Sequence, residues 1–184
     1  MTSTEGYTER YAAAHGRFVV VPASYVFLLR EGGSGTEVLL QLRQNTGYMD
    51  GHWAAGAAGH VERGETAYDA ARREACEELG LDDVALDFQF TMQRTQHAEA
   101  IDERVDFFFT ARRWSGEPRI VEPEKCAELR WWPLSALPDP VVPHERLALT
   151  SLDLSVSTDG GQDRGRGYLT FGFGPDPSEE DAHG

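Results

Sequence analysis

The chain contains a run of acidic residues whose spacing suits metal binding. Residues 59–81 read GHVERGETAYDAARREACEELGL, which we interpret as a loop followed by a helix that begins near Thr66. This helix would place Glu74, Glu77 and Glu78 three and four residues apart, and therefore on one face. Like charges at that spacing repel each other and destabilise a helix. A hard divalent cation such as Mg²⁺ or Mn²⁺ would relieve the repulsion, because carboxylate oxygens are ligands that it prefers.

The neighbouring residues are suited to hold this helix beside a core. Ala71, Ala75 and Leu79 form a small and apolar stripe that can pack on a sheet and keep the carboxylates at the rim of the core. Gly80 is expected to end the helix. Gly59 precedes it in a loop, where a backbone carbonyl can approach a metal or ligand without obstruction from a side chain.

The segment fits the pattern G-x5-E-x7-R-E-U-x-E-E-x-G-U, in which U is usually a bulky aliphatic residue. It thereby resembles the Nudix box of the Nudix hydrolase superfamily, with a more extended resemblance over residues 17–152. The sequence WAAGAAG at residues 53–59 departs from the Leu-Pro-Gly-Gly that many relatives carry, which bears on the subfamily. The positions in register are Gly59, Glu65, Arg73, Glu74, Glu77, Glu78, Gly80 and Leu81.

The resemblance implies a set of metal ligands for Mg²⁺ or Mn²⁺. Glu77 and Glu78 would bind the metal, and Glu74 would be a third ligand or the catalytic base. The carbonyl of Gly59 would complete the set. Such an ion neutralises charge on a diphosphate and lowers the pKa of a bound water that can attack phosphorus.

Other charged residues would assist the reaction. By the same resemblance, Arg73 orients the carboxylates by pairing with Glu65 or with the acidic cluster. The general base comes either from the box or from a later loop, because relatives differ in this respect. Glu99, Glu122 and Glu124 are the later candidates, and we take Glu124 as the catalytic prediction.

The expected reaction is cleavage of the diphosphate linkage in a nucleoside diphosphate linked to another group. The segment VEPEKC at residues 121–126 resembles a stretch in the nucleotide triphosphate diphosphatases of the superfamily, which favours a nucleoside triphosphate cleaved to monophosphate and pyrophosphate. Arg43 could bind the phosphates, as could Arg94 and Arg104, or each could lie at the surface. Trp53 could stack on the base or fill the core instead, and the same holds for several other aromatic side chains, including that of Tyr48.

Other functions remain open at the level of sequence. One alternative is a pyrophosphohydrolase of ADP-ribose, of a nucleotide sugar or of an RNA 5′ end. Another is an isomerase of prenyl diphosphates that uses the same fold, and a third is a non-catalytic ligand-binding module that has kept the fold. Base contacts come from loops with no fixed signature, so the preferred nucleotide stays undetermined.

The composition of the chain limits which kinds of molecule it can bind. The 184 residues suffice for one domain, and 17 basic against 31 acidic residues give a net charge of −14. This charge argues against stable binding to polymeric nucleic acid or to an anionic membrane. Two cysteines are too few for a disulfide framework, and we find neither a signal pattern nor an apolar run long enough to span a bilayer. We therefore expect a cytoplasmic protein.

The alternation of elements predicts an α/β fold, and the resemblance implies a Nudix-type α/β/α sandwich with a mixed β-sheet. We expect an N-terminal arm at 1–16, a Nudix hydrolase domain at 17–152 and a flexible C-terminal tail at 153–184, whose residues 168–173 could add a strand. The hairpin and the pair Trp131-Trp132 could support a homodimer. The predicted strands are 18–30, 37–43, 84–94, 104–114 and 127–132, the loop before Trp53 is 44–52, and the closing helix is 143–152.

Overall fold

The computed structural model describes residues 7–33, 35–96, 103–154 and 167–173. Within these residues, no helix is long and apolar enough to cross a membrane. The helices are α1 (Tyr7–Ala14), α2 (Ala67–Leu79) and α3 (Pro143–Leu154), together with a 3-10 helix, η3 (Leu134–Ala136). The strands are β1 (Val21–Gly32), β2 (Gly35–Arg43), β3 (Trp53–Ala55), β4 (Ala57–His60), β5 (Asp83–Arg94), β6 (Arg104–Ser115), β7 (Cys126–Pro133) and β8 (Tyr168–Phe171).

The described strands form one mixed sheet. Its order is β3-β2-β1-β6-β5-β8, with β4 paired to β1 and β7 paired to β2. β1 and β2 form the antiparallel hairpin that the sequence predicts, and β5 and β6 pair antiparallel over most of their length. The central pair β1 and β6 is parallel, as is the edge pair β5 and β8. The sheet is therefore mixed, as predicted.

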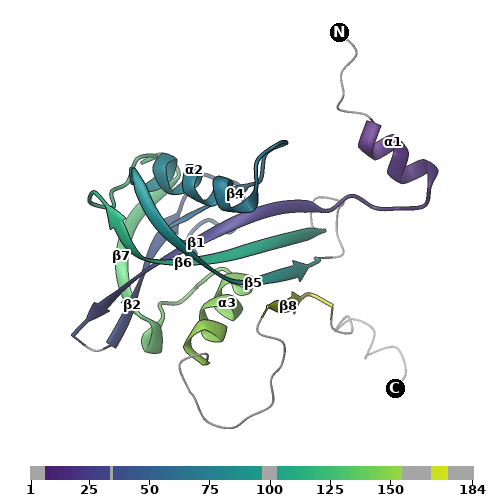
Figure 1. Cartoon of the computed structure of the whole chain (residues 1–184). Coiled ribbons are helices and arrows are strands. Elements are labelled where there is room, and N and C mark those ends of the chain that lie inside the picture. The colour runs from purple at the N-terminus through teal and green to yellow at the C-terminus, as the bar shows by residue number, and fades with distance from the viewer. Residues whose placement is uncertain (1–6, 34, 97–102, 155–166, 174–184) are drawn as a thin grey trace, which may run out of the picture.

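Two hydrophobic cores lie on opposite faces of this sheet. Successive side chains of a strand point to opposite faces, so Tyr25 and Phe27 of β1 enter one core while Val26 and Leu28 enter the other. Helix α3 covers the first core and α2 covers the second, and Figure 1 shows the two helices on either side of the sheet. This arrangement confirms the predicted α/β/α sandwich.

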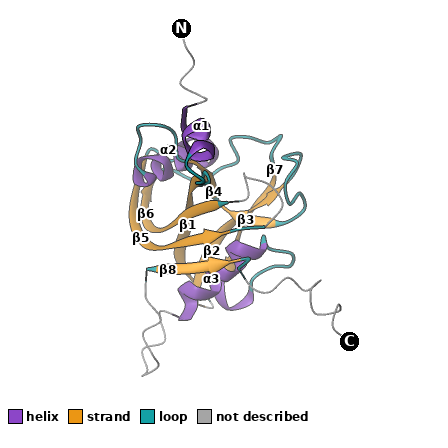
Figure 2. Cartoon of the chain, turned by 90° about the vertical axis from the view of Figure 1, so that its right-hand side faces the viewer, coloured by secondary structure: helices purple, strands orange, loops and turns teal. Residues whose placement is uncertain are grey.

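The C-terminal segment differs from the expected loose tail. Residues Tyr168–Phe171 form β8, which pairs with the edge of the sheet along β5 (Figure 2). Leu169 and Phe171 alternate with polar positions and pack against the first core, and this burial is the reason that the segment is ordered as a strand. The prediction of a loose tail is therefore wrong for these residues. The stretches 155–166 and 174–184 lie outside the described residues.

The two adjacent tryptophans of β7 are packed within the chain. Trp132 contacts the first core and Trp131 the second, because neighbouring residues of a strand face opposite ways. The Trp131 ring also stacks on Trp114 and lies beneath the guanidinium of Arg30. The pair therefore contributes to both cores, and a homodimer stays a prediction.

Candidate active site

Helix α2 is fixed at both ends, which sets the direction of its acidic face. Thr66 is the N-cap, and its side chain and that of Asp69 form a capping box. Gly80 follows the last helical residue with a left-handed φ of 68° and donates its N–H to the last turn. The predicted start and end of the helix are thus confirmed. Ala71, Ala75 and Leu79 are buried, as their stripe predicts.

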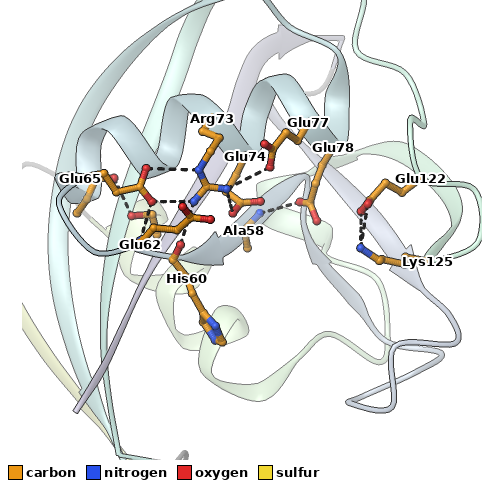
Figure 3. Close-up of polar contacts among 12 residues, drawn as sticks. Ala58, His60, Glu62, Glu65, Arg73, Glu74, Glu77, Glu78, Glu122 and Lys125 are labelled. Atoms are coloured by element: carbon orange, nitrogen blue, oxygen red, sulfur yellow. Dashed lines mark hydrogen bonds and ion pairs between the residues drawn. The ribbon is translucent and has the colours of Figure 1, made fainter. Parts of the chain in front are cut away.

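Strand β4 lies against α2 and positions two of its carboxylates through backbone atoms alone. The Ala58 N–H donates to Glu78 Oε2 at 2.9 Å. Gly59 leaves room for the carboxylate of Glu74, since a Cβ at this position would lie only 1.9 Å from Glu74 Oε1. Figure 3 shows Ala58, Glu74 and Glu78 together with Glu77 of the same helix. The glycine of the pattern is therefore required by close packing against Glu74.

Arg73 is bonded to several of the acidic residues at once. Its Nη1 donates to Glu74 Oε1 at 2.6 Å and to Glu77 Oε2 at 3.1 Å. Its Nη2 donates to Glu65 Oε1 at 2.8 Å and to the carbonyl of His60 at 3.0 Å (Figure 3). Both pairings that the sequence predicts for Arg73 are present. The guanidinium lowers the pKa of Glu65 and ties the acidic face to the loop ahead of the helix.

Burial sets the electrostatics of the cluster. Burial, followed by the negative charges of Glu74 and Glu122, raises the pKa of Glu78 to about 7, although the Ala58 hydrogen bond opposes the shift. Burial also raises the pKa of Glu74, although Arg73 opposes the shift. The Glu77 side chain is 57% exposed. The site therefore holds two desolvated carboxylates whose mutual repulsion a cation would relieve.

The described residues do not contain three His, Cys, Asp or Glu side chains already arranged around one point to hold a metal ion. The reason is local: Arg73 bonds both Glu74 and Glu77, and Glu78 is turned to the Ala58 N–H. The donor set nevertheless fits a hard cation, because it offers carboxylate oxygens next to a glycine backbone and carries repelling charge. Glu74, Glu77 and Glu78 are the residues that could hold the ion.

The loop before β7 brings Glu122, rather than Glu124, toward the cluster. The charge of Glu122 acts on Glu78, and its carboxylate pairs with Lys125 Nζ at 2.8 Å (Figure 3). Glu124 contributes its backbone carbonyl to Asn45, and its charge acts on Lys125 instead. Of these two loop carboxylates, Glu122 is the one whose charge acts on Glu78, and the role of Glu124 as the base stays a prediction. The third candidate, Glu99, lies outside the described residues.

A cavity of about 330 Å³ opens beside Ala58, Gly59 and His60. Arg43 lines it and is held by hydrogen bonds from Nε to the Tyr48 carbonyl and from Nη2 to Thr46 Oγ1, and its role in phosphate binding stays a prediction. Its wall also contains Arg94, Arg104, Tyr25, Tyr48, His144 and Glu145. The cavity and the acidic face of α2 therefore meet at β4.

Trp53 does not reach this cavity. Its side chain is buried in the first core, where its ring packs edge-on against Trp132 with centroids 5.2 Å apart. The predicted contact between Trp53 and a nucleotide base is therefore withdrawn. The direction of its side chain follows from the pairing of β3 with β2, which turns the indole toward the first core. Tyr25 of β1 and Tyr48, in the loop before β3, are the tyrosines at the cavity wall.

A buried network behind the cavity was missed by the sequence analysis. Arg94 Nε donates to Asp106 Oδ2 at 2.5 Å, and Arg94 Nη2 lies 3.4 Å from the hydroxyl of Tyr25. The His144 ring Nε2 lies 3.3 Å from the same hydroxyl. The signal that could have revealed Asp106 is a lone acid within the apolar strand sequence RVDFFFT, since a buried charge requires a partner.

Comparison with known proteins identifies the family to which this fold belongs. A family model described as the NUDIX domain matches residues 20–152. A protein named isopentenyl-diphosphate Delta-isomerase, from Jannaschia sp. (strain CCS1), is 34% identical over 127 residues, which cover 67% of this chain and 70% of that protein.

Solved structures show the same architecture. A MutT NUDIX hydrolase from Burkholderia pseudomallei is 28% identical with a TM-score of 0.61, over 72% of this chain and 97% of its own. The NUDIX domain of Shewanella oneidensis NrtR, solved with ADP ribose, is 17% identical with a TM-score of 0.58, over 83% of this chain and 99% of its own. The chain therefore belongs to the NUDIX family of hydrolases, as the spacing in residues 59–81 predicts.

Proposed function

We propose that the protein is a Mg²⁺- or Mn²⁺-dependent pyrophosphohydrolase that cleaves a nucleoside triphosphate to a monophosphate and pyrophosphate. The observation that carries the proposal is the meeting of two opposite charge environments at β4. The desolvated carboxylates of Glu74 and Glu78 lie on one side, and a cavity lined by arginines lies on the other. A phosphate chain bound across β4 would contact both.

Each residue of the site would have a distinct role in the reaction. Glu74, Glu77 and Glu78 would hold the ion, which, when bound, supplies neutralisation of phosphate charge and activation of a water. Arg73 would keep Glu74 and Glu77 oriented, since it already donates to both. Glu122 is our candidate for accepting the proton of the attacking water, because its charge already reaches the cluster.

A second candidate function is suggested by the relative named isopentenyl-diphosphate Delta-isomerase. An isomerase would need to place a short hydrocarbon beside an acid and a base while binding its diphosphate. The arginines of the cavity would bind the diphosphate of either substrate, whereas the carboxylates of Glu74, Glu77 and Glu78 favour a metal-activated water and hence hydrolysis. We therefore rank nucleotide hydrolysis first and test isomerisation in the same experiment.

The test is a product assay on the full chain with Mg²⁺ and with Mn²⁺. Nucleoside triphosphates, ADP-ribose, a nucleotide sugar, a 5′-triphosphorylated RNA and isopentenyl diphosphate are supplied in turn. We expect pyrophosphate and a nucleoside monophosphate from a triphosphate. Release of two monophosphates from ADP-ribose, or formation of dimethylallyl diphosphate, would assign a different member of the family. No product from any of them would favour a ligand-binding module.

A carboxylate substitution tests the assignment of the ligands. Glu77→Gln and Glu78→Gln each remove a negative oxygen and should abolish turnover while the protein stays folded. Glu117→Gln is the matched control, because Glu117 is exposed in the loop that follows β6. Thermal unfolding checks the fold of each variant. If Glu78→Gln keeps most of its metal-dependent activity, Glu78 is not a ligand.

A further inference from the structure

The loop that carries Glu122 is fixed to the acidic helix at its first half. This loop, residues 116–125, joins β6 to β7, and we call it the Glu122 loop. Carbonyls in the last turn of a helix have no partner within the helix and need donors from elsewhere. Two main-chain N–H groups of the loop donate to carbonyls in the last turn of α2: Arg119 to Leu79 at 3.1 Å and Val121 to Glu78 at 3.3 Å.

The second half of the Glu122 loop is held by two residues that follow β2. The main-chain N–H of Gln44 donates to the carbonyl of Lys125 at 2.8 Å. The side chains bond the two preceding carbonyls, since Gln44 Nε2 donates to Pro123 at 2.8 Å and Asn45 Nδ2 donates to Glu124 at 3.1 Å. Three consecutive carbonyls directly after the candidate base are therefore held by two adjacent residues.

Glu122 lies between these two sets of contacts. Its main-chain carbonyl accepts from the N–H groups of Lys125 and Cys126, both at 3.0 Å, which closes a turn. Its carboxylate accepts from Lys125 Nζ at 2.8 Å and 3.0 Å, so its bonding partner belongs to the same loop (Figure 3). The place of the carboxylate beside α2 therefore follows from the path of the loop, and the contacts that fix this path fix the carboxylate.

The two residues after β2 also belong to the wall of the cavity in sequence. Gln44 directly follows Arg43, which lines the cavity and donates to the carbonyl of Tyr48. Asn45 has a left-handed φ of 54°, a conformation that asparagine adopts more readily than most side chains and glycine most readily of all. Asn45 thus supplies both a backbone conformation and a side-chain donor, and glycine would supply only the first.

We propose that Gln44 and Asn45 are positioning residues, which hold Glu122 in the place where it can accept the proton of the attacking water. They act through the carbonyls of Pro123 and Glu124, and not by contact with the substrate. The proposal rests on the proposed hydrolase function, with Glu122 as the proton acceptor. Loss of either side-chain amide should therefore slow the reaction of the bound substrate and leave substrate binding in place.

The first test is steady-state kinetics with a nucleoside triphosphate and Mg²⁺. Gln44→Met removes the amide but keeps the length of the side chain, and Asn45→Gly removes the amide but keeps the left-handed backbone. Each should lower kcat by about tenfold with KM unchanged, because a small displacement of a catalytic group slows the chemical step. Gln89→Met is the matched control: Gln89 of β5 is also partly buried and donates to a backbone carbonyl, that of Asp87 at 3.2 Å. It should keep both constants.

A double substitution shows whether Gln44 acts through Glu122. In the Glu122→Gln background, Gln44→Met should lower kcat no further, because effects that act through one group are not additive. Fold-changes that multiply would show that Gln44 has a merely structural role. Multiplication with Glu122→Gln but not with Glu124→Gln would overturn the proposal in favour of Glu124. An unchanged kcat in both Gln44→Met and Asn45→Gly, or a rise in KM alone, would also overturn it.

Hydrogen exchange gives a second readout, without substrate or metal. The amides of Lys125 and Cys126 should exchange faster in Gln44→Met than in wild type, and as in wild type in Gln89→Met. Equal exchange in all three proteins would show that Gln44 does not hold the loop. Thermal unfolding checks the fold, and Asn45→Gly replaces Gln44→Met if the latter does not fold.

The two readouts separate this proposal from the proposed function. Hydrolysis by wild type, combined with an unchanged kcat in Gln44→Met, would remove the positioning role alone. No hydrolysis of any nucleotide by wild type would remove the proposed function and the positioning role with it. Faster exchange in Gln44→Met would in that case still establish the contact between the end of β2 and the Glu122 loop.

Discussion

The carboxylate of Glu74 lies so close to Gly59 that a side chain at residue 59 would clash with it. The carboxylate of Glu74 occupies the space that a side chain at residue 59 would fill, so the helix and strand β4 approach without a gap. The same carboxylate accepts from Arg73 at 2.6 Å. One glycine thus determines where a candidate ligand and its orienting arginine lie.

Gly59→Ala should reduce activity much more than stability. The new Cβ would meet the far end of a flexible side chain, so Glu74 can swing away at small cost to the fold. A displaced catalytic group should lower kcat by about 100-fold. Gly33→Ala is the control, because a Cβ at Gly33 meets nothing within 4 Å. Steady-state kinetics and thermal unfolding measure the two effects, and full activity in Gly59→Ala would contradict this role of the contact.

Glu145 should make the stability of the folded protein depend on pH, and a substitution at this residue can measure that contribution. Burial raises its pKa from 4.5 to about 7, against the charges of Arg43 and Arg94 and with that of Asp106. Its protonated form is therefore favoured by folding. The associated stability is fully present below pH 4.5 and is lost as the pH rises through about 7.

Glu145→Gln should remove this loss, since an amide oxygen can still accept from the Ala55 N–H. The free energy of unfolding of the variant, relative to wild type, should increase between pH 4.5 and 8 by up to about 3 kcal/mol. Urea unfolding at several pH values measures the difference. If the difference between the two proteins does not change with pH, Glu145 ionises in the folded state as it does in the unfolded state.

Residue roles could be predicted from sequence only where the backbone fixes the direction of a side chain. Spacing along one helix places Glu74 and Glu78 together, and Arg73 with them, whatever the rest of the fold does. Trp53 and Glu124 depend instead on strand pairing and on the path of a loop. A shift of one residue turns a strand side chain to the other face, which sequence spacing does not determine.

At the scale of elements, helix α2 depends on its caps more than on its composition. Its acidic side chains repel, and the helix has no basic residue in its last turn to offset the dipole. Thr66 and Asp69 satisfy N–H groups at the start, and Gly80 satisfies the end. The caps thereby fix the acidic face in register with β4.

Thr66→Ala should destabilise the protein by about 1 kcal/mol, because the Asp69 N–H loses its acceptor. Thr66→Ser keeps a hydroxyl and is the matched control. Urea unfolding followed by circular dichroism gives both free energies. Equal losses in the two variants would indicate that the threonine methyl group, and not the capping hydrogen bond, is responsible.

The elements that sequence predicts well are those with signals at both ends. The hairpin of β1 and β2 surrounds a glycine-rich turn, and α2 lies between a threonine and a glycine, so their bounds are recovered closely. In β8, exposed and partly buried side chains alternate as in a strand, but over only four residues. Its order comes from pairing with β5, which lies far away in the sequence, and no local signal reports such a partner.

At the scale of the whole molecule, one sheet separates two hydrophobic cores, and each core supports a different part of the candidate active site. The second core carries α2 and the acidic face, while the first lies beneath α3 and the buried network of Tyr25 and His144. Strand β1 contributes alternate residues to both. Loss of packing on either face should therefore loosen the strand that both faces share, and the chain should unfold as one unit.

Cooperative unfolding of the whole domain can be tested with one substitution in each core. Leu79 of α2 is 1% exposed and Leu149 of α3 is 0% exposed, so replacing either with alanine should cost about 2–5 kcal/mol. Leu147→Ala on α3 is the control, since Leu147 is 37% exposed and should lose far less. Urea unfolding is followed by circular dichroism and by tryptophan fluorescence, which reports Trp53 and Trp132 at the first core and Trp114 and Trp131 at the second. Coincident transitions in all variants are expected. Separate transitions in Leu149→Ala would show instead that the α3 face unfolds alone, and that the acidic face of α2 does not depend on it.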